Sequence, residues 1–204
     1  MFRAVELYTF LNYCEDSPLE KVVLDCGAGF PQGFEPLLLR FHERGYQTHG
    51  IELLPERVAV AELYGREHGI DLGIRQGDMR ALPFADASMS FVFSYNTIFH
   101  MTRAEMAGAV HEIERVLRPG GWCFVNFLSV DDGWYGQGEV VGPGEFLQNE
   151  GDAKALHTYL ADDDAEAFFV QTHVVDKTKR INEWTHDGES YRAAYLDYMV
   201  QKAG

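Results

Sequence analysis

The chain has 204 residues, 46% of them apolar, so a single domain can bury a sizeable core without disulfides or metals. Its formal net charge is −15 and its basic residues are dispersed, which argues against nucleic acid and anionic membranes as partners. No apolar run reaches the roughly 18 residues that span a bilayer, and the first residues lack the pattern of a signal peptide. The three cysteines are scattered and form no CxxC pair, so we expect a cytoplasmic protein.

The first 128 residues alternate between apolar patterns typical of helices and of buried strands. In chain order, they predict a helix over 2–13, a strand over 22–24, a helix over 34–41, a strand over 47–51, a helix from Pro55 to Gly69, strands over 72–76 and 91–93, a helix that begins at a Thr102–Glu105 capping box and stops before Pro119, and a strand over 122–128. This alternation predicts an α/β fold with a mostly parallel sheet and helices on both faces.

The last third of the chain has a different pattern. Residues 129–151 are rich in glycine and predict a long stretch without regular structure, which in a small domain is typically a lid or disordered. A helix is predicted over 165–170, and strands over 173–181 and 194–202 are expected to pair antiparallel across a turn at 182–189. We therefore divide a single domain, residues 1–204, into a core (1–128), a lid or acceptor region (129–160), and a final helix and β-hairpin (161–204).

The first strand ends in the loop Asp25-Cys26-Gly27-Ala28-Gly29. Ligands of open α/β sheets bind at such strand ends, and glycines let a ligand approach the backbone, although glycines also serve merely as turns. A dinucleotide fingerprint requires a third glycine where this chain has Gln32. In addition, Asp25 would repel a pyrophosphate but would suit a cationic ammonium, such as the one in the methionine part of S-adenosylmethionine.

The next two predicted strands also end in acidic residues. Glu52 ends the second strand, where a carboxylate can accept hydrogen bonds from both ribose hydroxyls. Asp78 ends the third, where a carboxylate can accept a proton from an adenine amino group. A single acid at a strand end is common on any surface, but acids at three consecutive strand ends along one rim favour a binding site.

These segments resemble the class I S-adenosylmethionine-dependent methyltransferases of the small single-domain type. The resemblance covers residues 20–128 and rests on VVLDCGAG (22–29), GIEL (50–53), GDMRALPF (77–84) and ERVLRPGG (114–121). It implies a Rossmann-like methyltransferase fold, with a mostly parallel seven-stranded sheet whose C-terminal strand runs antiparallel. It also implies S-adenosyl-L-methionine as the cofactor.

The resemblance also assigns each part of the cofactor to residues at the strand ends. The residues implied are Asp25, Gly27, Ala28 and Gly29 for the methionine end, Glu52 for the ribose, Leu53, Asp78 and Met79 for the adenine, and Asn96 and Thr97 for the surroundings of the sulfonium.

Two positions depart from the family pattern. Pro31 stands where many members have a third glycine, and proline removes an N–H and fixes φ, so the contacts of residues 30–33 are left open. Ser90 replaces the acid that usually begins the fourth strand.

Methyl transfer is an in-line displacement on an activated carbon, so an enzyme contributes mainly by positioning the reactants. A base is needed only where the acceptor must lose a proton. His100, just after the fourth strand, is the candidate base, and His157 is a weaker one. The alternative for His100 is a solvent-exposed histidine at the start of a helix.

Aromatic residues in the predicted lid are candidates for acceptor contacts. Trp134 and Tyr135 could cover the acceptor, or they could simply anchor the loop. A metal-assisted mechanism would require carboxylates converging from the fourth and fifth strand ends. Asn96 stands at the first of these places and residues 131–132 lie beyond the second, so no metal is expected.

The leading hypothesis is therefore a methyltransferase that uses S-adenosylmethionine and acts on a small-molecule acceptor. One alternative is a non-catalytic S-adenosylmethionine-binding protein that acts through a partner. A nicotinamide-dependent oxidoreductase is disfavoured by Gln32 and Asp25. Aminopropyl transfer from a related sulfonium would use a similar pocket. The sequence does not identify the acceptor.

Overall fold

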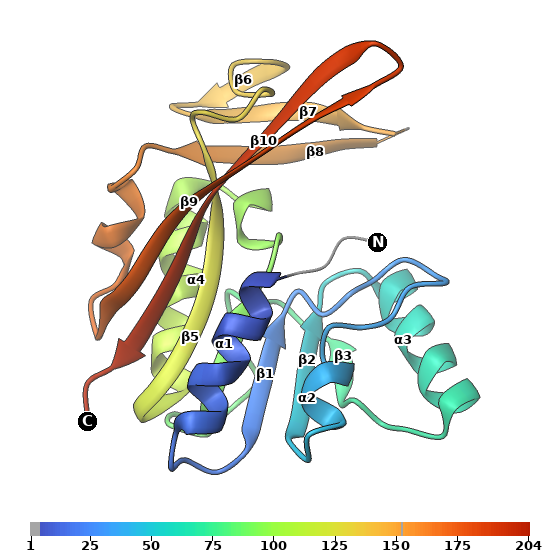
Figure 1. Ribbon diagram of the computed structural model, residues 1–204, viewed down its shortest axis with the longest axis vertical. Helices are drawn as coiled ribbons and strands as arrows, with labels where there is room; N and C mark the ends of the chain where they lie inside the picture. The colour runs from blue at the N-terminus through green and yellow to red at the C-terminus, as the bar shows by residue number, and fades with distance from the viewer. Residues whose placement is uncertain (1–4, 152) are drawn as a thin grey trace.

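Seven strands form the central sheet of a computed structural model that describes residues 5–151 and 153–204 (Figure 1). Their order is β3-β2-β1-β4-β5-β10-β9. The first five pair in parallel, and β10 runs antiparallel to both β5 and β9, so the predicted α/β fold and antiparallel C-terminal strand are confirmed. The strands are β1 (Val22–Cys26), β2 (Gln47–Glu52), β3 (Ile74–Gln76), β4 (Met89–Ser94), β5 (Leu117–Ser129), β9 (Thr172–His186) and β10 (Glu189–Lys202).

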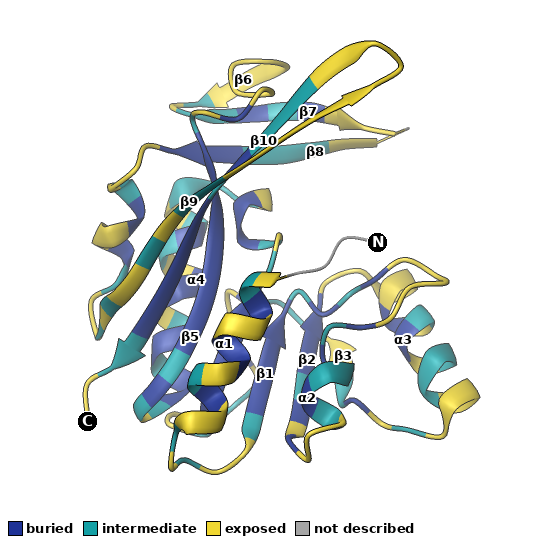
Figure 2. Ribbon diagram, in the orientation of Figure 1, coloured by how far each residue is buried: buried dark blue, intermediate teal, exposed yellow. Residues whose placement is uncertain are grey.

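Helices cover both faces of this sheet because successive residues of its buried strands point to opposite sides. Leu24 and Val92 belong to the core under α4, whereas Val23 and Phe91 belong to the core under α1 and α2. Figure 2 shows β1 and β5 as largely buried strands. None of the helices in the described part of the chain is long and apolar enough to cross a bilayer. They are α1 (Val5–Asp16), α2 (Leu39–His42), α3 (Pro55–His68), α4 (Arg103–Val116) and the 3-10 helices η1 (Ile98–His100) and η2 (Asp164–Phe168).

A second, antiparallel sheet occupies the region that was predicted to lack regular structure. It consists of β6 (Glu139–Gly142), β7 (Glu145–Glu150) and β8 (Ala153–Leu160), and Figure 1 shows it beyond the carboxyl ends of β1 and β2. Two residue pairs, Leu128–Tyr159 and Ser129–Leu160, join it to β5. The prediction of a structureless stretch was therefore wrong. With β6, β7 and β8 joined through β5, the described residues form a ten-stranded sheet rather than the predicted seven-stranded one. The glycines that suggested disorder instead make tight turns, as at Gly144 with φ of +74°.

Two predicted helices are shorter than expected. The helix predicted over 34–41 is reduced to α2, which begins at Leu39. The segment before it is not a regular helix, because Pro36 lacks the N–H that an interior helical residue donates. Phe34, placed on the buried face by its spacing, is 62% exposed. The final predicted helix is the short 3-10 helix η2. The first helix begins at Val5 in the described part of the chain, and residues 2–4 of the prediction lie outside it.

The C-terminal hairpin is longer than predicted. Its strands pair from Thr172–Lys202 to His186–Glu189, so most of the predicted 182–189 turn is strand. The turn itself is Asp187-Gly188, both with positive φ (51° and 82°). This is the two-residue connection that Asp-Gly favours, and its twist matches that of the strands.

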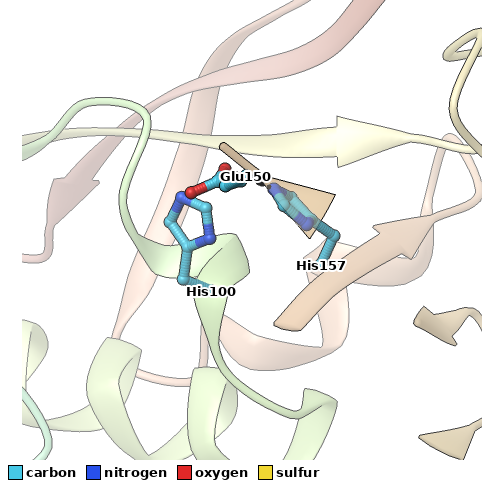
Figure 3. Close-up of side chains that lie close together, drawn as sticks. All are labelled: His100, Glu150 and His157. Atoms are coloured by element: carbon cyan, nitrogen blue, oxygen red, sulfur yellow. Dashed lines mark hydrogen bonds and ion pairs between the residues drawn. The ribbon is translucent and has the colours of Figure 1, made fainter. Parts of the chain in front are cut away.

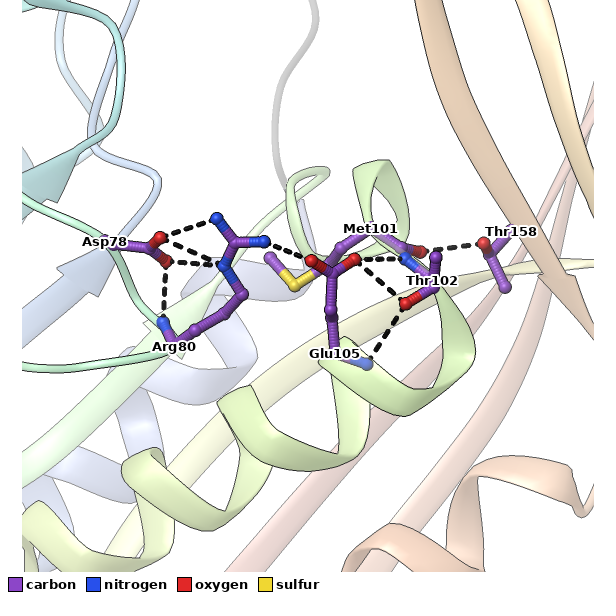
Figure 4. A network of polar contacts seen from close by, with 6 residues as sticks. All are labelled: Asp78, Arg80, Met101, Thr102, Glu105 and Thr158. Atoms are coloured by element: carbon purple, nitrogen blue, oxygen red, sulfur yellow. Dashed lines mark hydrogen bonds and ion pairs between the residues drawn. The ribbon is translucent and has the colours of Figure 1, made fainter. Parts of the chain in front are cut away.

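The predicted capping box at the start of α4 is present. Glu105 N donates to Thr102 Oγ1 (3.3 Å), and Thr102 N donates to Glu105 Oε2 (2.9 Å). Glu105 also forms an ion pair with Arg80, which binds Asp78 in the loop after β3 (Figure 4). The cap thus connects the first turn of α4 to the rim of the sheet.

We predict that Thr102→Ala lowers the free energy of unfolding by about 1 kcal/mol, the typical contribution of an N-cap hydroxyl. Thr102→Ser keeps the hydroxyl and should stay close to the wild type. Urea unfolding followed by circular dichroism measures both. Equal stability of the alanine variant and the wild type would show that the cap contributes nothing.

Candidate cofactor and acceptor site

The loop after β1 lies directly against the segment after β4. Gly27 N and Ala28 N donate to the Ile51 carbonyl of β2 at 2.8 and 3.0 Å. Gly27 has φ of +100°, and a β-carbon there would lie 2.2 Å from Thr97 Oγ1. The structure therefore brings together residues that the sequence analysis placed at the methionine end and near the sulfonium.

Glu52, at the end of β2, holds this loop in place. Its Oε2 accepts a hydrogen bond from Gly29 N (2.8 Å), and its Oε1 accepts one from Leu54 N (2.9 Å) at the start of α3. The carboxylate is 7% exposed, and a β-carbon on Gly29 would lie 2.2 Å from Oε2. Each carboxylate oxygen has a further lone pair, so Glu52 can still accept a hydrogen bond from a ligand hydroxyl.

Asp25 places a second buried carboxyl group beside Glu52. Its side chain is 3% exposed, and among the described residues none forms an ion pair with it. Burial, together with the negative charge of Glu52, raises the pKa of Asp25 well above its ordinary value. A cation bound here would relieve that repulsion, so this carboxylate suits the ammonium group of S-adenosylmethionine.

The residues predicted for the adenine differ in their availability. Arg80 binds both oxygens of Asp78 (2.6–3.0 Å), and these hydrogen bonds lower the pKa of the Asp78 carboxyl. Met79 is 5% exposed and packs in the core. Leu53 is 55% exposed and follows Glu52 directly, so its side chain is free to contact a flat ring. The roles of Asp78 and Met79 stay predictions.

A reciprocal pair of amides fixes the turn after β4. Asn96 N donates to Asn126 Oδ1 (2.7 Å), and Asn126 Nδ2 donates to Asn96 Oδ1 (2.6 Å). Asn96 has φ of 54°, a conformation that asparagine tolerates better than most residues. Asn126 is fully buried in β5 and was missed by the sequence analysis. The sequence feature that could have indicated it is the single amide side chain within the apolar run 122–128.

Two histidines and a carboxylate meet beyond the strand ends (Figure 3). His100 Nδ1 lies 3.1 Å from the Leu156 carbonyl, and His157 Nε2 lies 3.0 Å from Glu150 Oε1. Desolvation by the surrounding protein lowers the pKa of His100, and the neighbouring His157 lowers it further. The sequence analysis named both histidines but did not predict that they meet, and it missed Glu150.

The two aromatic residues of the predicted lid lie in the turn that leads to β6. Tyr135 packs edge-on against Phe146 and Tyr159, with ring centroids 5.6 Å away in each case. The Trp134 carbonyl accepts a hydrogen bond from Gln148 Nε2 (2.8 Å). Both side chains stay partly exposed, at 49% for Trp134 and 44% for Tyr135. Tyr135 therefore anchors this turn on the second sheet, and a role of either residue in acceptor binding stays a prediction.

We predict that Asp25→Asn raises the free energy of unfolding at neutral pH. Because the folded-state pKa of Asp25 is raised, its stabilising contribution is lost as pH rises through that value, and the neutral amide avoids this loss. The gain should vanish as pH falls toward the unfolded value of about 3.9.

Urea unfolding at both pH values tests this effect, with Asp176→Asn, at an exposed position of β9, as the matched control. A destabilised Asp25→Asn protein at neutral pH would contradict the electrostatic account.

The sequence of this chain is similar to those of known proteins. The family model described as a methyltransferase domain matches residues 24–125. The dimethylglycine N-methyltransferase of Parasynechococcus marenigrum is 31% identical over 125 residues, 58% of this chain and 41% of that protein. The sterol 24-C-methyltransferase ERG6B of Gibberella zeae is 31% identical over 120 residues, 54% of this chain and 30% of that protein. The chain thus matches less than half the length of each of these relatives.

The fold also matches solved structures. A structure from Methanosarcina mazei, described as a SAM-dependent methyltransferase, superposes with a TM-score of 0.73 at 19% identity and covers 96% of this chain and 97% of that one. Together with the family match, this shows that the chain belongs to the methyltransferase-domain family of class I S-adenosylmethionine-dependent methyltransferases.

Proposed function

We propose that this protein transfers the methyl group of S-adenosyl-L-methionine to a small-molecule acceptor. The observation that carries the proposal is the buried carboxylate pair of Asp25 and Glu52 beside a glycine loop. This pair lies at the carboxyl end of the parallel strands, where open α/β sheets bind their ligands.

Each part of the cofactor has a chemically suited partner in this proposal. Asp25 would face the ammonium, and the backbone of residues 27–29 would lie along the methionine end. The free lone pairs of Glu52 would accept hydrogen bonds from the ribose hydroxyls, and the exposed side chain of Leu53 would lie against the adenine. The bound cofactor supplies a methyl group on a sulfonium that already activates it for displacement.

The remaining residues of the site would position the acceptor and handle its proton. The Asn96–Asn126 pair would hold Thr97 against the loop after β1. Trp134, in the turn that leads to β6, would limit the access of water. The lowered pKa of His100 keeps its imidazole neutral at neutral pH, so it would be able to accept a proton from an acceptor hydroxyl or ammonium.

The proposed acceptor class rests on the relatives and on charge. The names of the two curated relatives specify acceptors as different as dimethylglycine and a sterol. The formal net charge of −15 favours a neutral or cationic acceptor over an anionic one. A reducing cytoplasm is the proposed location, since the three cysteines Cys14, Cys26 and Cys123 are free and buried.

Calorimetry with S-adenosylmethionine and S-adenosylhomocysteine tests the binding half of the proposal. A screen of small amines, hydroxylated compounds and sterols, read out as S-adenosylhomocysteine formed, tests the transfer half. Folded protein that binds neither ligand would overturn the proposal. Binding without turnover on any acceptor would favour a non-catalytic protein that acts through a partner.

We predict that Gly29→Ala lowers the affinity for S-adenosylmethionine at least tenfold, equivalent to about 1.4 kcal/mol. The added β-carbon would overlap Glu52 Oε2 and displace the carboxylate that holds the loop. Gly108→Ala, in α4 with open space around its β-carbon, is the matched control and should bind like the wild type. Equal affinities for the Gly29→Ala and Gly108→Ala proteins, measured by calorimetry, would contradict this role of the loop.

A further inference from the structure

We propose that His100, Glu150 and His157 form a binding site for a divalent transition-metal ion of the zinc class. The three residues come from η1, β7 and β8, and one ligand atom from each lies within 4.8 Å of the others. Figure 3 shows the side chains directed toward a common space. Two imidazoles and one carboxylate are the ligand set of many catalytic zinc sites.

The backbone orients His100 as a metal ligand. Its Nδ1 lies 3.1 Å from the carbonyl oxygen of Leu156. A carbonyl can only accept a hydrogen bond, so Nδ1 carries the proton and Nε2 of the neutral ring keeps its lone pair. Metal-binding histidines are commonly fixed in this way, with one ring nitrogen donating to a backbone carbonyl while the other binds the ion.

His157 has a buried nitrogen without a partner. Its Nε2 lies 3.0 Å from Glu150 Oε1, and since a carboxylate accepts, Nε2 carries the proton there. Its Nδ1 is buried and has no hydrogen-bond partner among the described residues. A buried acceptor without a partner is costly. A cation bound through the Nδ1 lone pair would remove this cost.

The three ligand atoms need to move only slightly closer together to bind an ion. Zinc–ligand bonds of about 2.0–2.2 Å place the ligand atoms of a tetrahedral site about 3.4 Å apart. The side chain of Glu150 is 52% exposed at the end of β7, so it can rotate toward the histidines without moving the core. Ala155 lies on the same face of β8 as His157. Its small methyl side chain leaves room for Glu150, which pairs with Ala153, to reach His157.

The site adjoins the candidate cofactor loop. His100 follows Thr97 by three residues, and Arg57, whose Cδ lies against the position of a Gly29 β-carbon, also acts electrostatically on His100. Three protein ligands leave one position of a tetrahedral ion open to water or to an acceptor atom. Because the ion would occupy the Nε2 lone pair of His100, it would replace His100 as the group that promotes loss of the acceptor proton, by making that proton more acidic. This acceptor role rests on the proposed methyl transfer, whereas metal binding itself does not.

Binding is tested on the full chain without a histidine tag, treated with a chelator and dialysed. Titration with ZnCl₂ by calorimetry should give one ion per chain. Titration with CoCl₂ should give the intense visible absorption of a four-coordinate ion. His100→Ala, His157→Ala and Glu150→Gln should each weaken zinc binding by more than about tenfold. Removal of a residue that only hydrogen-bonds to a metal ligand already weakens binding by about tenfold or more.

His111→Ala, at an exposed histidine of α4, is the matched control and should bind zinc like the wild type. Circular dichroism checks the fold of each variant. Glu150→Gln, at an exposed strand end, keeps the test informative if a histidine variant does not fold. No stoichiometric binding by the wild type, or equal binding by all the cluster variants and the control, would overturn the proposal. Neither outcome depends on S-adenosylmethionine binding or turnover.

Discussion

The candidate site depends on one side chain, the carboxylate of Glu52. Its two oxygens accept hydrogen bonds from Gly29 N, in the loop after β1, and from Leu54 N, at the start of α3. This position also affects the electrostatics, because burial raises the pKa of the Asp25 carboxyl and the nearby charge of Glu52 raises it further. The folded protein thus keeps two acids side by side away from water, and a cationic ligand removes part of the cost.

The elements that were predicted correctly are those that residues close together in the sequence determine. The apolar runs of β1 and β4 are buried on both faces, Gly69 caps α3 in a left-handed conformation, and the Thr102–Glu105 box begins α4. Glu52 could be placed at a strand end from sequence position alone. Its hydrogen bond to Gly29 could not, since it depends on the pairing of β1 with β2.

Features that arise from contacts distant in sequence were missed. The second sheet was read as a lid because its glycines and exposed apolar residues, such as Val140, have no strong strand periodicity. His100 and His157 lie 57 positions apart, and only the docking of β8 beside η1, through the Thr158–Met101 hydrogen bond (2.7 Å), brings them together (Figure 4). Likewise, the Arg80–Asp78 ion pair reflects a side-chain conformation that no spacing rule predicts.

The second sheet has a consequence for how this protein can diverge. It is one continuous stretch of chain between β5 and β9, and its strand pairing with the central sheet is limited to the ends of β5 and β8. The loop after β1, Glu52 and the Asn96–Asn126 pair belong to the central sheet and its connections. Mutations in β6 and β7 can therefore alter what approaches the rim while leaving the cofactor half intact. In this arrangement the hydrogen bonds of the strand-end site constrain the central sheet, whereas the sequence of the second sheet can change without breaking them.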